Sequence, residues 1–135
     1  MNLILKEDTG ITNGRHVIIY DVEGWNNGII SAVELVMSLK EKFRGIREIE
    51  VKPASDHSVP RETMYYKTFE EFKQNEKDFT NEYIKDYIEY INIDGIDVDN
   101  LNEIIFSINP KNKTVVLGKK PLEKNINSSW KFFYR

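Results

Sequence analysis

The residues best able to do chemistry crowd into positions 78–100, DFTNEYIKDYIEYINIDGIDVDN. Carboxylates alternate there with tyrosines and isoleucines, and such carboxylates could bind a metal ion, meet a basic partner or simply face water. On a helix of 3.6 residues per turn, four of these acids fall within an arc of about 80°. They are Asp78, Glu82, Asp86 and Glu89, with Tyr90 beside them and with Asp94, Asp97 and Asp99 following in an expected loop.

The spacing of the loop acids does not match a calcium site. An EF-hand loop places oxygen ligands at alternate positions, a glycine at the sixth and a glutamate at the twelfth. Counted from Asp97, those two positions hold Asn102 and Ile108, and the register that begins at Asp94 fails in the same way. We therefore expect no metal site beyond weak adventitious cation binding, and no cofactor. The acids then form either a hydrated face or an acidic ridge that meets a basic protein.

His57 has the only neighbours that suggest nucleophilic catalysis, because it lies in the sequence SDHS. A serine-histidine-acid site needs its groups to converge in space around an oriented base, which sequence neighbours seldom do. No nucleophile elbow and no glycine-rich phosphate loop accompanies it, and the absence of cysteine excludes thiolate chemistry. We predict that the chain is not an enzyme. A small enzyme or a ligand-binding domain with a cleft near His57 remains the alternative.

Trp25, in the sequence EGWNNG, permits two interpretations. It could fold back over the edge of the core, or it could be an exposed anchor, since tryptophan is enriched in interface hot spots. The last part of the chain is basic and aromatic, with seven Lys or Arg and one acid in residues 104–135. Nucleic-acid binding needs an aromatic-lined basic groove, however, and a strand with one wet face explains WKFFYR equally well. We expect no direct contact with nucleic acid.

Apolar patterning predicts the elements that must position these residues. Short apolar or alternating runs predict strands, and Asn13-Gly14 predicts a tight turn between the first two because both residues tolerate positive φ. The expected strands are 3–5, 16–22, 46–52, 103–108 and 114–118, with a last strand in WKFFY near the C-terminus.

Two helices are expected from their start signals. The first begins with a capping box at Ser31 and ends before Gly45. The second begins with a capping box at Thr68 and runs to about Ile91, allowing a break near Asn75. Its apolar face would hold Phe79, Tyr83, Ile84, Tyr87, Ile88 and Ile91.

These elements favour an α+β fold, a single domain over residues 1–135 with a mostly antiparallel sheet and two to three helices packed on one face. The length of 135 residues and the hydrophobic content of 40% suit one compact core. The opening MNLILKED is too short in apolar residues for a signal peptide, and no run approaches the ~20 apolar residues of a membrane span. We expect a soluble, cytoplasmic protein.

The chain resembles the small bacterial immunity proteins that neutralise polymorphic toxins, as in contact-dependent growth inhibition. The resemblance concerns the character of the chain rather than a motif: small size, no cysteine, no catalytic constellation, and the acidic, tyrosine-containing EYIKDYIEYINIDGIDVD. It implies an antitoxin, a monomer or weak dimer, that binds a basic, nuclease-type toxin domain. An acidic adaptor subunit of a larger assembly is a further alternative. The partner-binding candidates are Asp78, Glu82, Asp86, Glu89, Tyr90, Asp94, Asp97, Asp99 and Trp25.

Overall fold

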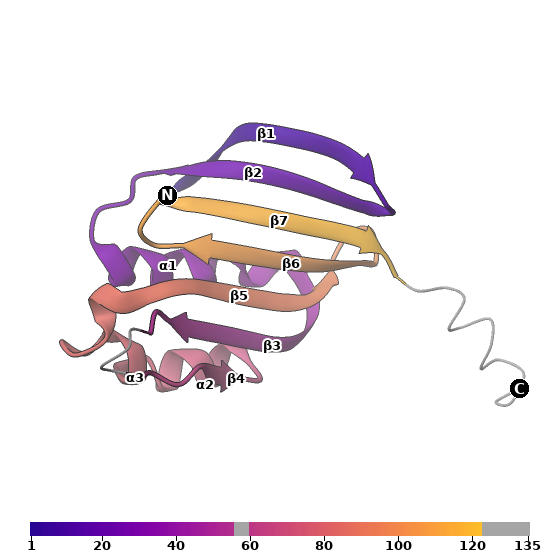
Figure 1. Cartoon of the computed structure of the whole chain (residues 1–135). Coiled ribbons are helices and arrows are strands. Elements are labelled where there is room, and N and C mark those ends of the chain that lie inside the picture. Colours follow the sequence, from indigo (N-terminus) through magenta and orange to yellow (C-terminus); the bar gives the residue numbers. More distant parts are fainter. Residues whose placement is uncertain (56–59, 123–135) are drawn as a thin grey trace, which may run out of the picture.

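The computed structural model describes residues 1–55 and 60–122. They form one antiparallel sheet of seven strands in the order β1-β2-β7-β6-β5-β3-β4 (Figure 1). The strands are β1 (Asn2–Thr12), β2 (Arg15–Glu23), β3 (Phe43–Pro53), β4 (Met64–Tyr66), β5 (Ile88–Asp97), β6 (Asn102–Asn109) and β7 (Thr114–Pro121). The helices are α1 (Gly28–Leu39), α2 (Phe69–Gln74) and α3 (Lys77–Thr80), with 3-10 turns η1 (Lys40–Lys42) and η2 (Lys85–Tyr87).

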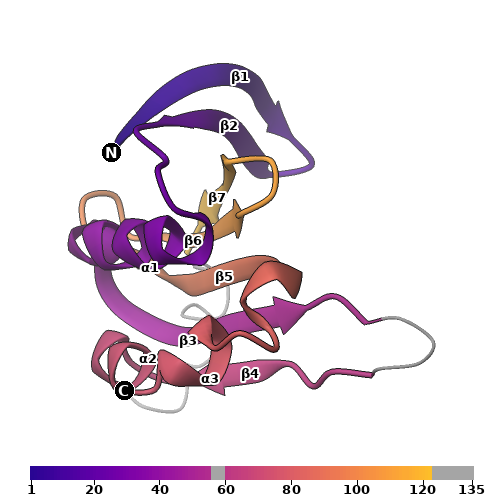
Figure 2. The ribbon, with the colours of Figure 1, turned by 90° about the vertical axis from the view of Figure 1, so that its left-hand side faces the viewer.

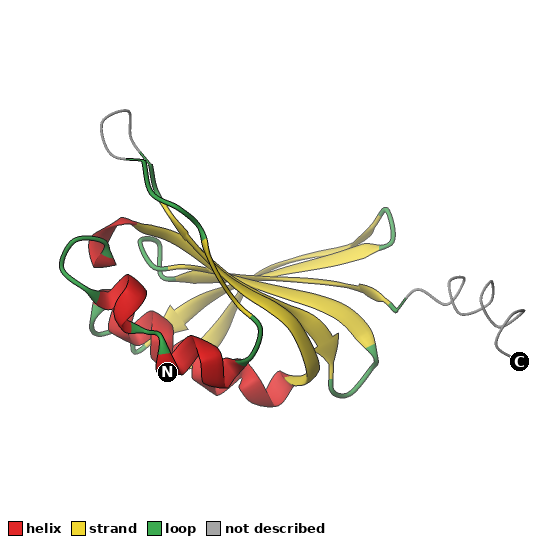
Figure 3. Ribbon diagram, turned by 90° about the horizontal axis from the view of Figure 1, so that it is seen from below, coloured by secondary structure: helices red, strands yellow, loops and turns green. Residues whose placement is uncertain are grey.

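The predicted α+β class is confirmed, because the sheet is antiparallel throughout and α1 and α2 lie along one of its faces (Figure 3). Helix α1 leads from β2 to β3 and thereby passes the three strands that separate them in the sheet, β7, β6 and β5 (Figure 2). No helix in residues 1–55 and 60–122 is both long and apolar enough to cross a membrane.

The turn predicted at Asn13-Gly14 is confirmed. Both residues have positive φ, 55° and 75°, and they join β1 to β2 as a two-residue hairpin. Positive φ at both central positions is the geometry that matches the right-handed twist of the flanking strands, and asparagine and glycine adopt it at low cost. The local sequence therefore determines this hairpin.

The core lies between the helices and the sheet face that they cover. Alternate strand residues point into it, such as Ile49 and Val51 on β3 and Ile91 and Ile93 on β5, all fully buried. A second group of rings closes one end, where Phe72 stacks on Phe79 at 5.0 Å between centroids and Tyr66 contacts both. Burial of this apolar surface is the main stabilising contribution to the fold.

The opposite face of the sheet carries none of the described helices, and we call it the bare face. Its side chains come from the alternate positions of the same strands. In an antiparallel sheet such a face is commonly polar and hydrated. Here it is mixed, because Ile105 is 41% exposed and Val17 and Val116 are half-buried beside it.

The long second helix is a wrong prediction. Its start is correct, since the Thr68 hydroxyl accepts a hydrogen bond from the Glu71 N–H at 3.0 Å. Helix α2 ends at Gln74, however, and α3 has only four residues. From Ile88 onward the chain is β5, which pairs with β3 on one side and β6 on the other. The isoleucines of β5 fit a strand because they alternate with polar residues, and they are buried by partners distant in sequence.

The start of the first helix also differs from the prediction. Helix α1 begins at Gly28, so Ser31 lies within its first turn rather than at its cap. The Ser31 hydroxyl instead accepts hydrogen bonds from the N–H groups of Asn26 and Asn27, at 3.0 and 2.9 Å. Gly45 lies inside β3 and does not cap a helix. The expected strand in WKFFY lies outside the described residues.

Candidate functional site

The predicted acidic ridge does not exist as one helical face. Asp78 lies on α3, Glu82 in the following turn, Asp86 on η2 and Glu89 on β5. The ridge prediction is wrong because the chain turns at Asn81, between α3 and η2, and enters the sheet at Ile88. Asp78 has a structural partner, since the Tyr66 hydroxyl donates a hydrogen bond to its carboxylate at 3.1 Å.

The three loop acids also separate. Asp94 lies on the bare face of β5, where the Arg47 guanidinium binds its carboxylate at 2.8 Å. Asp97 ends β5, and its carboxylate accepts the Asp99 N–H at 2.8 Å, which shapes the turn into β6. In residues 1–55 and 60–122, no three histidine, aspartate or glutamate side chains gather as a metal site would require.

Trp25 is not an exposed anchor. Only 9% of its surface is exposed, and it belongs to the hydrophobic core. The alternative interpretation, that it folds back over the core, is therefore the correct one. Two further candidate regions, the segment around His57 and the basic C-terminal aromatic segment, fall outside the described residues.

Three of the predicted residues, Glu82, Asp86 and Glu89, lie in a segment that we call the acidic turn, residues 81–89, which runs from the end of α3 through η2 to the second residue of β5 (Figure 2). Tyr83 projects from it with 88% of its surface exposed. The helix prediction had placed this tyrosine on the apolar packing face. The residue that indicates the turn is Asn81, because an asparagine side chain readily forms a turn by hydrogen bonding to the backbone two residues further on.

Asn81 fixes the backbone of the acidic turn from both directions. Its side-chain carbonyl accepts the Tyr83 N–H at 2.9 Å, and its backbone carbonyl accepts the Lys85 N–H at 2.9 Å. Its amide group donates to the carbonyl oxygens of Lys77 and Asp78, at 3.0 and 3.2 Å. The exposed tyrosine therefore rises from a backbone that several hydrogen bonds hold in one conformation.

Tyr87 ties the other end of the acidic turn to the body of the protein. Its carbonyl accepts the Ala54 N–H at 2.6 Å, and the Arg61 guanidinium lies 4.1 Å from the centre of its ring. Ile84, which lies between Tyr83 and Tyr87 in the sequence, packs against the core. Such a cation–π contact contributes about 0.5–1 kcal/mol at an exposed site.

The charge of the acidic turn is negative and uncompensated. Glu82, Asp86 and Glu89 form no ion pair within residues 1–55 and 60–122, and Lys85 is the single cation of the segment. On the adjoining bare face, burial raises the pKa of Tyr90, and the carboxylates of Glu50 and Glu89 raise it further. Tyr90 therefore remains a neutral hydrogen-bond donor among acids at physiological pH.

Comparison with protein-family models, with curated proteins and with solved structures found no match to this chain.

Proposed function

We propose that this chain is an immunity protein, an antitoxin that acts in the cytoplasm by binding a cognate, basic, nuclease-type toxin domain. The surface that makes the contact is the acidic turn. One observation carries the proposal: Tyr83 is 88% exposed on a backbone fixed by Asn81, and the three carboxylates around it have no ion-pair partner among the described residues.

The physics of recognition favours this arrangement. A tyrosine supplies a large, rigid contact area and a hydroxyl, and residues of this type are enriched among those that dominate binding energy. Because the turn is already ordered by hydrogen bonds, less conformational entropy is lost on binding. The uncompensated carboxylates accelerate encounter with a basic partner and disfavour acidic ones. Tyr87, which is 45% exposed in the same turn, adds a second aromatic ring to this surface.

The test uses the toxin domain expected beside this gene, at the variable C-terminus of a large secreted protein. Tyr83→Ala and the double variant Glu82→Lys/Asp86→Lys should each weaken binding by about tenfold or more, which is at least 1.4 kcal/mol. The difference in affinity between the double variant and the wild type should shrink at high salt, because surface charges are screened there. Cells that carry these variants should lose protection from the toxin.

The double variant Glu34→Lys/Glu41→Lys is the matched control, because Glu34 on α1 and Glu41 on η1 are exposed acids that form no ion pair with a described residue. It changes the net charge by the same amount as the double variant in the turn, and it should leave binding and protection unchanged. Wild-type binding by both Tyr83→Ala and the double variant in the turn would exclude the acidic turn as the interface. If the control variant lost as much affinity as the double variant in the turn, the loss would follow from net charge and not from the acidic turn.

A further inference from the structure

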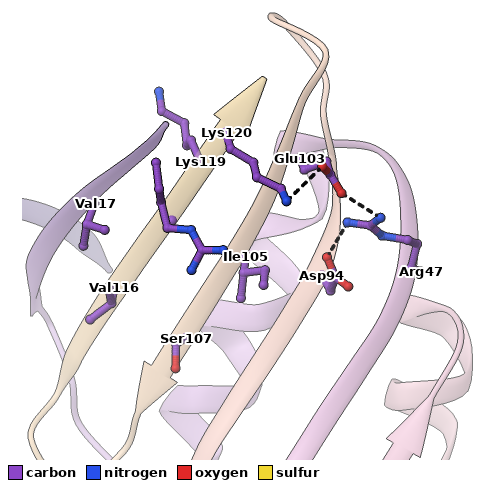
Figure 4. A pocket seen from close by; sticks show the side chains of 11 residues that line it. Val17, Arg47, Asp94, Glu103, Ile105, Ser107, Val116, Lys119 and Lys120 are labelled. Carbon is purple, nitrogen blue, oxygen red and sulfur yellow. Dashed lines mark hydrogen bonds and ion pairs between the residues drawn. The ribbon is translucent and has the colours of Figure 1, made fainter. Parts of the chain in front are cut away.

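The bare face has a hollow of about 450 Å³ near its centre, away from the acidic turn (Figure 4). Its floor is apolar, formed by Val17 on β2, Val116 on β7 and Ile105 on β6. Ligand sites typically have volumes of about 300–1,000 Å³ and combine such a floor with a few polar groups. The size and lining of the hollow suit a small organic molecule.

Gly118 accounts for the depth of the hollow. It lies in register with Val17 on one neighbouring strand and with Ile105 on the other. A Cβ atom added at Gly118 would meet nothing within 4 Å, so the gap between the two apolar side chains is open space. The φ of this glycine is not in the left-handed region, and the backbone alone does not require glycine here.

The rim of the hollow contains an ion-pair network that neutralises its own acids. The Arg47 guanidinium binds Asp94 at 2.8 Å and Glu103 at 3.0 Å. The other oxygen of Glu103 lies 3.6 Å from the Lys120 ammonium, so that Figure 4 shows this carboxylate between two cations. The two acids and the two bases of this network balance one another.

One further cation lines the hollow outside that network. Arg15, on the same face of β2 as Val17, forms no ion pair within the described part of the chain. The hollow therefore carries an excess of positive charge over an apolar floor, although the whole chain has a net charge of −3. A ligand that matches both properties has an apolar body and a negative group.

We propose that this hollow is a binding site for a small organic anion, whose apolar body fills the gap over Gly118 and whose negative group meets Arg15. This inference goes beyond the proposed antitoxin function and is independent of it, because none of the lining residues belongs to the acidic turn. The site would add a ligand-responsive surface to a protein that binds its main partner elsewhere.

The experiment measures the binding of two fluorescent probes to the full chain. The probes are 8-anilinonaphthalene-1-sulfonate and the neutral N-phenyl-1-naphthylamine, which share an apolar body and differ in the sulfonate. The wild-type protein should bind the anionic probe at least tenfold more tightly than the neutral one. Gly118→Val fills the gap with a residue suited to a strand, and it should weaken binding of the anionic probe at least tenfold while thermal stability is kept. Arg15→Gln should weaken binding of the anionic probe severalfold and leave that of the neutral probe unchanged.

Two controls keep the outcome decisive. Gly45→Val alters a glycine of β3 that is equally open but does not line the hollow, and Arg44→Gln removes an exposed cation elsewhere on β3. Both should bind the probes as the wild type does. The proposal is overturned if wild-type protein binds neither probe, if the neutral probe binds as tightly as the anionic one, or if Gly118→Val binds both probes normally.

Discussion

Substituting Gly95 by alanine should destabilise the protein more than any other single added methyl group on the sheet. Gly95 lies in β5, buried, opposite Ile46 of β3. Its Cβ would overlap the carbonyl oxygen of Gly45, and it would lie 2.7 Å from Phe43 Cδ1 and 2.9 Å from Ile46 Cα. Two of these three atoms belong to the backbone of a paired strand, so they cannot yield by a change of rotamer.

The size of the stability loss depends on which atoms must move to accommodate the added methyl group. Adding a methylene group to a well-packed core typically costs about 1–3 kcal/mol. We expect the upper end, about 3 kcal/mol, because β3 must shift as backbone and because the Phe43 ring also contacts Phe69 and Phe106, each at 5.8 Å between centroids. For a chain of this length, that loss lowers Tm by roughly 10 °C.

Urea unfolding gives the value directly, from the shift in midpoint at constant m. Gly118→Ala is the control in the same sheet, since its added Cβ meets nothing within 4 Å. It should change stability by less than about 1 kcal/mol, and the gain of a side chain in a strand favours a slight increase. A loss below about 0.5 kcal/mol in Gly95→Ala would contradict this prediction, because it would mean that the backbones of β3 and β5 leave room for the added methyl group.

Two other outcomes are expected. Burial and the hydrogen bond to Asp78 raise the pKa of Tyr66, so the folded state favours the neutral phenol. The contribution of this group to stability should be complete below the unfolded pKa of about 10 and should decline as the pH rises above it. Tyr66→Phe should remove part of that decline when the free energy of unfolding is measured against pH. Calcium should bind no more tightly than the millimolar range, because the Asp97 carboxylate already accepts the Asp99 N–H; a micromolar site in calorimetry, lost in Asp97→Asn, would contradict this.

The parts of the fold that the sequence predicted are those decided by neighbours along the chain. The Asn13-Gly14 hairpin and the Thr68 cap depend on the φ angles and hydrogen bonds of a few residues, and both are confirmed. The segment after Asn81 failed because its isoleucines satisfy a helical spacing and a strand spacing equally. Pairing with β3 and β6 decides for the strand, and the paired residues lie 35–54 positions away on β3 and 7–17 positions away on β6.

The candidate surfaces were harder to predict because they also depend on residues that are far apart in the sequence. Acids near one another in sequence were expected to share a face, yet Asp94 belongs to an ion-pair network with Arg47 and Glu103 on other strands. No local pattern connects Arg47 with Glu103, which are 56 positions apart. The exposure of Tyr83 was missed because a tyrosine at apolar spacing is usually a packing residue, and only the turn at Asn81 reverses that expectation.

The position of β7 between β2 and β6 has a consequence for how the molecule folds. Strand β7 pairs with β2 on one side and β6 on the other, so the first hairpin joins the rest of the sheet only through a strand from the far end of the described chain. Closing the loop of 93 positions between Asp21 and Thr114 costs about 4 kcal/mol of chain entropy, before any constant term. Folding should therefore be slow for the size of the domain, in the range of milliseconds to seconds. During synthesis, one edge of β2 stays unpaired until β7 has been synthesised. A mutation that slows the pairing of β7 would leave this edge of β2 free to pair with other chains.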